Sequence, residues 1–361
     1  GGATDIDGLS DAVTYDSGVS IGLGTGALAN DDGTDNNNTA VGYNALNANT
    51  SGNLCTAVGN GALAANTTAP RNTAVGNDAL NDCTTGQFNT AVGMNAGDVV
   101  TTGSNNVLLG YSAGGSLTTG SSNVFAGWEA ANNQTSAQYG VAIGVSAGLN
   151  GTANYTVSIG NTAGYYGAKG ANNVCIGTAA GYGTSSVSST GSGVYIGHNA
   201  GKRITNTYRN VFLGGEAGSR NTSGNGNIFI GFEASGNATY GTTTGSNVIV
   251  IGHEASPSSN TASNEITLGN NSTSSLRIPG LQSGASDGQV LTYNSTNGNI
   301  TLADAGGGAT DIDGLSDARA NTTAYVHLGT GAGGTATSGT AVGINAGASG
   351  MGAGTVYVGN L

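Results

Sequence analysis

Short apolar runs with alternating side chains recur along this chain. Residues 38–46 read NTAVGYNAL and residues 72–80 read NTAVGNDAL, with related versions at 54–63 and 89–97. In each version, an aliphatic or β-branched residue directly precedes a glycine, here called the anchor glycine. A second such residue usually stands three positions before the same glycine. This alternation has a period of two, and no stretch keeps a helical period. The pattern therefore predicts one short β-strand in every copy.

The copies are evenly spaced. Successive anchors from Gly24 to Gly269 are most often 17 residues apart, and further anchors follow at Gly329, Gly343 and Gly359. An alanine stands three residues after nearly every anchor. Such a period predicts one structural unit copied along an axis. The repeat positions that define the unit include Gly42, Gly59, Gly76, Gly93, Gly110, Gly127, Ala45, Ala62, Ala79 and Ala96.

Turn-forming residues fill the rest of each copy, as in residues 118–123, which read TTGSSN. Asparagine recurs four residues before the anchor, where it could form hydrogen-bonded ladders between copies. We therefore predict an all-β fold, a parallel β-roll or β-solenoid with coils of about 17 residues. The small residues at fixed positions predict a narrow interior.

The residue two positions before the anchor is also often apolar. We expect the residues one and three before the anchor to face inward, including a column of Thr39, Thr56, Thr73 and Thr90. The position between them should then face outward, where it carries Leu108, Phe125, Cys175, Tyr195, Phe212, Phe229 and Val250. Bulky apolar side chains on an outer face usually contact another chain. This pattern predicts a homotrimer.

The period stops after Gly269, and Asn297-Gly298 then suggests a hairpin. Residues 307–318 repeat residues 1–12 letter for letter, so we expect a longer parent built from modules, of which this sequence is an excerpt. The expected segments are a connector at 1–17, a β-roll at 18–272, a hairpin and linker at 273–306, a second connector at 307–320, and the start of a second β-roll at 321–361.

Composition narrows the class of protein. The chain of 361 residues has 67 glycines, 6% aromatic residues and 8% charged residues, too few bulky side chains for large globular cores. Its net charge of −12, with eight Lys and Arg, argues against nucleic-acid binding. No apolar run is long enough for membrane insertion. Three cysteines without C-x-x-C spacing indicate neither a disulfide framework nor a zinc site.

Two stretches resemble bacteriophage tail fibres: TASNEITLGNNSTSSLRIPG at 261–280, and the connector-like residues 288–318. The coils are similar to the head repeats of trimeric autotransporter adhesins. This resemblance implies a trimeric tail-fibre shaft on a virion, next to other tail or filament proteins and with a role in host-surface binding. In that family such a segment often precedes an intramolecular chaperone domain. A bacterial trimeric adhesin or another extracellular filament is the alternative, and a polysaccharide-degrading tailspike is a third interpretation.

Acidic residues supply the first candidate sites. Asp31, Asp32 and Asp35 are clustered in one coil and could bind calcium, although the spacing is not that of an EF-hand and a polar turn explains it too. A second set stands two residues after the anchor and could be a cation ladder, a glycosidase pair or a solvated face. It consists of Asp78, Glu129, Glu216, Glu233 and Glu254.

Aromatic and basic residues supply the other candidates. Tyr111 and Trp128 occupy one repeat position in adjacent coils and could form a sugar platform or a packing ladder. The basic group of Lys202, Arg203, Arg209 and Arg220, beside His198, could bind an anionic polysaccharide or another chain, or could balance Glu216. The longer coils at 180–197 and 235–252 should project loops. No catalytic triad or phosphate loop occurs, so we expect neither an enzyme nor a cofactor.

Overall fold

We describe a computed structural model of the chain. It describes the backbone of residues 12–15, 20–33, 36–151, 154–166, 170–184, 191–236, 244–275, 289–293, 300–304, 318–321, 325–328, 339–342 and 355–358. Side chains are described for the parts of these ranges between 20 and 275. All regular secondary structure in these residues is β, and none of them belongs to a helix that could cross a membrane. The chain divides into two units, Gly1–Thr273 and Ser274–Leu361.

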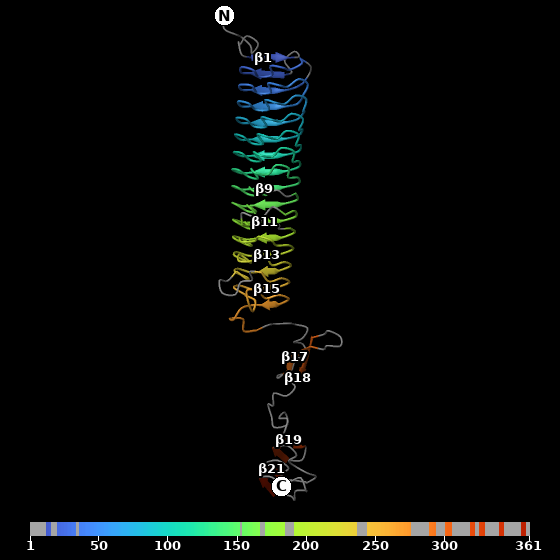
Figure 1. Ribbon diagram of the computed structural model, residues 1–361, viewed down its shortest axis with the longest axis vertical. Helices are drawn as coiled ribbons and strands as arrows, with labels where there is room; N and C mark the ends of the chain where they lie inside the picture. The colour runs from blue at the N-terminus through green and yellow to red at the C-terminus, as the bar shows by residue number, and fades with distance from the viewer. Residues whose placement is uncertain are drawn as a thin grey trace. The chain divides into compact units, whose positions relative to one another are not determined.

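The first unit contains one sheet of 16 strands in sequence order. β1 (Ala12–Tyr15) pairs antiparallel with β2 (Ser20–Leu23), and 15 strands from β2 onward run parallel, stacked one above another in Figure 1. The remaining strands are β3 (Thr39–Val41), β4 (Thr56–Val58), β5 (Thr73–Val75), β6 (Thr90–Val92), β7 (Val107–Leu109), β8 (Val124–Ala126), β9 (Val141–Ile143), β10 (Val157–Ile159), β11 (Val174–Ile176), β12 (Val194–Ile196), β13 (Val211–Leu213), β14 (Ile228–Ile230), β15 (Ile249–Ile251) and β16 (Ile266–Leu268).

The second unit contains two smaller sheets. β17 (Gln289–Tyr293) pairs antiparallel with β18 (Ile300–Asp304), as expected for the hairpin, although the turn at Asn297-Gly298 lies outside the described residues. β19 (Ala318–Asn321) pairs antiparallel with β20 (Tyr325–Leu328). β20, β21 (Gly339–Val342) and β22 (Thr355–Val358) then run parallel. Most of both predicted connectors also lies outside the described residues.

Every parallel strand pairs with its neighbour at the same repeat position. Ala57 of β4 stands opposite Ala74 of β5, for example, and Phe212 of β13 stands opposite Phe229 of β14. β3 to β16 have three residues each, and the turns fill the remainder of the coil. The prediction of an all-β solenoid with coils of about 17 residues is therefore confirmed.

The predicted direction of the strand side chains was wrong. In β3 to β15 the middle residue, two before the anchor, faces the interior, and Leu108, Phe125 and Phe212 are at most 1% exposed. The residues on either side of it face outward. The column that begins with Thr39 is accordingly half-buried or exposed rather than internal. In most of these strands, both the middle residue and its two neighbours are apolar. Alternation alone therefore does not show which of the two sets faces the interior.

Anchor glycines allow the coils to approach closely. From Gly42 to Gly269, each anchor has a positive φ, +139° at Gly76, and donates its N–H to the carbonyl oxygen of the residue before the anchor of the preceding coil. For Gly76 and Val58 this distance is 2.8 Å. A Cβ atom at Gly76 would lie 2.4 Å from the carbonyl oxygen of Gly93, the next anchor. A side chain here would therefore clash with backbone, which explains why the glycine recurs in every coil.

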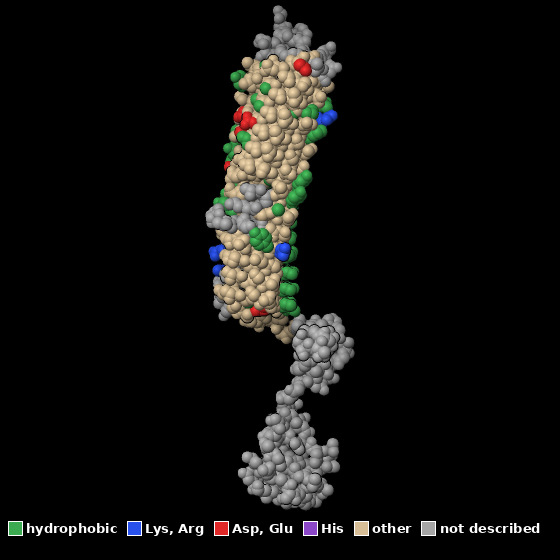
Figure 2. Space-filling model, turned by 45° about the vertical axis from the view of Figure 1, so that its right-hand side comes forward, with side chains coloured by type: hydrophobic (Ala, Val, Ile, Leu, Met, Phe, Trp, Pro, Cys, Tyr) green, Lys and Arg blue, Asp and Glu red, His purple; other side chains and the backbone are tan. Residues whose placement is uncertain are grey.

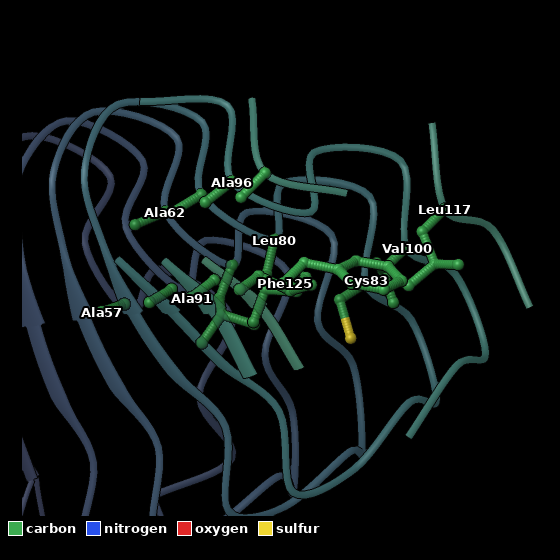
Figure 3. Close-up of a cluster of buried hydrophobic side chains, with 14 of the residues drawn as sticks. Ala57, Ala62, Leu80, Cys83, Ala91, Ala96, Val100, Leu117 and Phe125 are labelled. Atoms are coloured by element: carbon green, nitrogen blue, oxygen red, sulfur yellow. The ribbon is translucent and has the colours of Figure 1, made fainter. Parts of the chain in front are cut away.

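From β3 to β8, the core exchanges side-chain volume between two repeat positions. In β3 to β6 the middle residue is alanine, and a leucine four residues after the anchor of the preceding coil, such as Leu80 before β6, fills the interior (Figure 3). Where the strand supplies Leu108 or Phe125 instead, the leucine is replaced by Gly97 or Gly114. A Cβ atom at Gly97 would lie 2.4 Å from Leu108 Cδ1. From β3 to β8, a large side chain at one of the two positions is therefore paired with a small residue at the other.

The predicted asparagine ladder is present and buried. Asn106 donates its side-chain N–H to the carbonyl oxygen of Gly120 at 2.9 Å, within its own coil. Its side-chain oxygen accepts the backbone N–H of Asn123, the equivalent residue one coil later, at 3.1 Å. Asn89 and Asn123 make the same two kinds of bond. Each amide thus ties the start of a strand to the opposite turn and to the next coil.

Replacing an anchor glycine should destabilise the roll strongly. We expect Gly76→Ala to lower the free energy of unfolding by about 2 kcal/mol or more, because the new Cβ meets backbone at a strained φ. Gly33→Ala is the matched control, because Gly33 also has a positive φ (+74°) but nothing within 4 Å of a new Cβ. It should cost about 1 kcal/mol. Denaturant unfolding followed by circular dichroism measures both, and equal effects would contradict the role assigned to coil contact.

The volume exchange in the core can be tested by a double-mutant cycle. Leu108→Ala alone should cost about 3 kcal/mol through a cavity, and Gly97→Leu alone about 2 kcal/mol through overpacking. Together they recreate the pairing of Leu80 with Ala91, and Leu80 already adopts a φ of +50° at the equivalent position. The double variant should therefore recover at least about 1 kcal/mol of the summed loss, as measured by denaturant unfolding. Simple additivity would contradict the exchange.

Candidate interaction surfaces

The outward side chains of the parallel strands form a continuous apolar surface. This strand face consists of the residues one and three before each anchor in β2 to β16. No charged residue occupies either position in these strands, and from β7 onward all are aliphatic. Leu109 is 39% exposed and Ile143 is 40% exposed. Lines of hydrophobic side chains along the roll are visible in Figure 2. This surface, rather than the buried middle column, is the apolar face available to a partner.

Aromatic residues flank the strand face on both sides. Tyr111 and Trp128, each directly after an anchor, stack with ring centroids 4.3 Å apart and planes 23° apart. On the other side, Tyr139 and Tyr155 stack at 5.0 Å. Trp128 is 54% exposed. The structure therefore brings Tyr111 and Trp128 together, in a position to extend the apolar surface or to receive a sugar ring.

The basic residues divide between two surfaces. Lys202, Arg203 and Arg220 line one hollow of about 630 Å³, together with His198. Arg209 lies beside Tyr208 in a separate hollow. Figure 2 likewise shows basic side chains at separate places across the roll. The sequence groups these four cations by proximity along the chain, but the coil turns between Arg203 and Arg209 and carries them to different surfaces.

Three of the acidic candidates share the same backbone conformation. Glu216, Glu233 and Glu254 stand at equivalent positions of successive coils, each with φ between +53° and +59°. Glu216 accepts a hydrogen bond from Asn199 Nδ2 at 2.5 Å, and its Oε1 lies 3.6 Å from His198 Nδ1. No group of three His, Cys, Asp or Glu side chains able to hold a metal ion occurs among the described residues.

The calcium candidates contact amides instead. Asp31 accepts hydrogen bonds from the Gly33 backbone N–H at 3.0 Å and from Asn36 Nδ2 at 3.3 Å. Asn36 Nδ2 also lies 3.2 Å from Asp32 Oδ1. Asp35 lies outside the described residues. The two described carboxylates thus take part in a local turn network.

A tyrosine cluster was missed by the sequence interpretation. Tyr165 and Tyr182 stack at 5.0 Å with planes 10° apart, and Tyr166 meets both rings edge-on. Burial raises the pKa of the Tyr165 and Tyr182 hydroxyls. The signal was available, because Tyr165 and Tyr182 both stand five residues after an anchor. The loops expected within 180–197 and 235–252 fall largely outside the described residues.

The three cysteines are free and buried. Burial raises the pKa of the Cys83 and Cys175 thiols to about 12, and it also raises the pKa of Cys55. The Cys83 thiol donates a hydrogen bond to the carbonyl oxygen of Gly86 at 3.3 Å. These cysteines act as small core residues, since reactive thiols require a lowered pKa and solvent access.

Comparisons with known proteins identify no relative. No family model, no curated protein and no solved structure matches this chain.

The buried thiols predict both slow labelling and a pH dependence. In the folded chain at pH 8, a thiol reagent should label the cysteines far more slowly than in denaturant. The folded pKa values of about 12 exceed the ordinary thiol value of 9.0, so proton loss favours the unfolded chain. The thiol contribution to stability should therefore be complete below pH 9 and decrease as the pH rises toward 12. Cys175→Ala should reduce this dependence in unfolding experiments at pH 8 and pH 10.5, and rapid labelling of the native chain would contradict burial.

Proposed function

We propose that this chain is a non-enzymatic structural module of an extracellular fibre, the shaft of a bacteriophage or phage-like tail fibre. In this proposal three copies associate through their strand faces, with other tail proteins at their ends. The observation that carries it is the uncharged strand face, which is aliphatic from β7 onward. A role in host-surface binding accompanies the role as a spacer.

The dimensions of the strand face suit association. Fifteen strands spaced about 4.8 Å apart give a length of about 70 Å. Two columns of side chains are about 10 Å wide, so the face covers on the order of 700 Å². That area exceeds the apolar patches of ordinary monomers and approaches the area of about 800 Å² that each partner contributes to a standard interface. Leaving it in water would be costly for the single chain.

A copy of the same chain is the partner best suited to this face. The columns run straight along the roll because every strand pairs in register, as Val174 of β11 does with Val194 of β12. Copies arranged around an axis parallel to the roll place equal coils at equal height, so β-branched columns meet identical columns. The face carries no charge, whereas the chain as a whole carries −12 and would otherwise repel its copies. The number three comes from the resemblance to trimeric fibres and adhesin heads.

The strand order supports a modular shaft. Ala12 of β1 and Ala318 of β19 end identical twelve-residue sequences, and each belongs to a strand that pairs antiparallel with the next. Parallel pairing then begins in both places, from β2 to β3 and from β20 to β21. We propose that β20 to β22 start a second roll of the same kind, after the β17–β18 hairpin.

The number of associated copies should be measurable from the molecular mass of the protein in solution. We expect light scattering with size-exclusion chromatography to give three times the chain mass of 34.8 kDa. Ile143→Asp combined with Ile230→Asp should shift the protein toward the single-chain mass, because two carboxylates would be buried without partners. Circular dichroism should show that the fold persists, since both side chains already face outward.

The matched control places the same charges elsewhere. Thr119→Asp combined with Asn206→Asp changes exposed turn residues away from the strand face and should leave the mass unchanged. A wild-type chain that stays monomeric at micromolar concentration would overturn the proposal. Equal dissociation by both double variants would show that the strand face is not the interface.

A further inference from the structure

Tyrosines and cations occupy neighbouring coils on one side of the roll, apart from the strand face. They stand five or six residues after the anchors of four consecutive coils. The tyrosines belong to the first two of these coils and the cations to the last two. In order, the residues are Tyr165, Tyr166, Tyr182, Lys202, Arg203 and Arg220.

Backbone hydrogen bonds fix this order. The N–H of Tyr166 donates to the carbonyl oxygen of Tyr182 at 2.7 Å, and the N–H of Gly183 donates to that of Lys202 at 3.2 Å. Tyr182 and Lys202 therefore occupy equivalent positions of adjacent coils. With coils about 4.8 Å apart, the distance along the roll from Tyr165 to Arg220 is about 15 Å.

The three cations form no close ion pair with a carboxylate of the described residues. Within the described part of the chain, no Asp or Glu oxygen lies within 4.0 Å of Lys202, Arg203 or Arg220. The nearby Glu216 is instead bound by Asn199 and lies beside His198. Among the described residues, no close ion pair therefore joins Glu216 to this group. Cations that are unpaired in a protein of net charge −12 are available to an anionic ligand.

The surface around the cations is hollow and mixed in character. The hollow of about 630 Å³ is also lined by Glu216, Phe232 and Glu233. Two carboxylates would weaken the binding of a densely charged polyanion. They would, however, accept hydrogen bonds from hydroxyl groups, while the cations bind acidic groups. This combination suits a ligand that carries many hydroxyls and a few negative charges.

We propose that this surface binds an acidic oligosaccharide, one whose sugars carry carboxylate or sulfate groups. Lys202, Arg203 and Arg220 bind the acidic groups, and Tyr182 offers the edge of a stacked aromatic cluster to a neighbouring sugar ring. The length of about 15 Å accommodates several sugars rather than one. The inference goes beyond the proposed shaft, because this surface needs no second copy to be complete.

Titration calorimetry at low salt tests the proposal with three acidic probes: hexagalacturonate, a heparin-derived hexasaccharide and a sialic acid oligomer. Neutral maltohexaose serves as the comparison. We expect at least one acidic probe to bind and maltohexaose not to bind, with affinity decreasing as salt rises. The triple variant Lys202→Ala, Arg203→Ala, Arg220→Ala should weaken binding at least tenfold, and Tyr182→Ala should weaken it severalfold.

Arg209→Ala is the matched control, because it removes a cation of the same sequence group from a different surface. It should change the affinity less than twofold. Absence of binding by all three acidic probes, or equal binding by the triple variant, would overturn the proposal. So would a triple variant that loses only salt-sensitive self-association, since the cations would then bind an acidic surface of another copy. Shortening of a bound probe would contradict the non-enzymatic function but leave the binding surface standing.

Discussion

The close backbone contact between successive coils is the constraint on which the structure depends. An ideal Cβ at each anchor from Gly24 to Gly231 would lie between 2.2 and 2.8 Å from the next anchor. The anchors from Gly42 to Gly269 also each donate a hydrogen bond to the preceding coil. A coil can stack in this way only if it repeats the positions of the coil below. The near-identity of the repeats follows from this geometry, because a different residue at the anchor would separate two coils and interrupt the ladder.

This stacking also explains the core. A fixed coil spacing leaves a narrow interior, which the coils from β3 to β8 fill in one of two ways. Leu80 with Ala91 is one solution, and Gly97 with Leu108 is the other. Tyr195 and Phe212 extend the second solution, with Gly201 between their rings. The buried asparagines satisfy the polar backbone that a narrow coil would otherwise leave without partners.

The same register creates the surfaces. Because equivalent residues align along the roll, a repeat position becomes a column, and a preference for valine or isoleucine at one position becomes an apolar face about 70 Å long. Where single coils depart from the pattern, local groups arise, such as Tyr165 beside Tyr182 or Lys202 beside Arg203. The proposed shaft interface consists of strand positions that recur in every coil, whereas the proposed oligosaccharide surface consists of residues found in only a few coils.

The sequence by itself determined the repeat, the parallel β-solenoid and the asparagine ladder, because the period and the recurring residue types indicate these directly. It did not determine the phase of the strands. Valine at 107 and leucine at 108 are both apolar, and only the packed coil shows that Leu108 lies against Gly97 while Val107 faces outward. The replacement of leucine by glycine four residues after the anchor could have indicated that the middle residue of the strand faces the interior. The separation of Arg209 from Lys202 was decided by the tertiary structure alone, since the path of the turn sets which surface each side chain occupies.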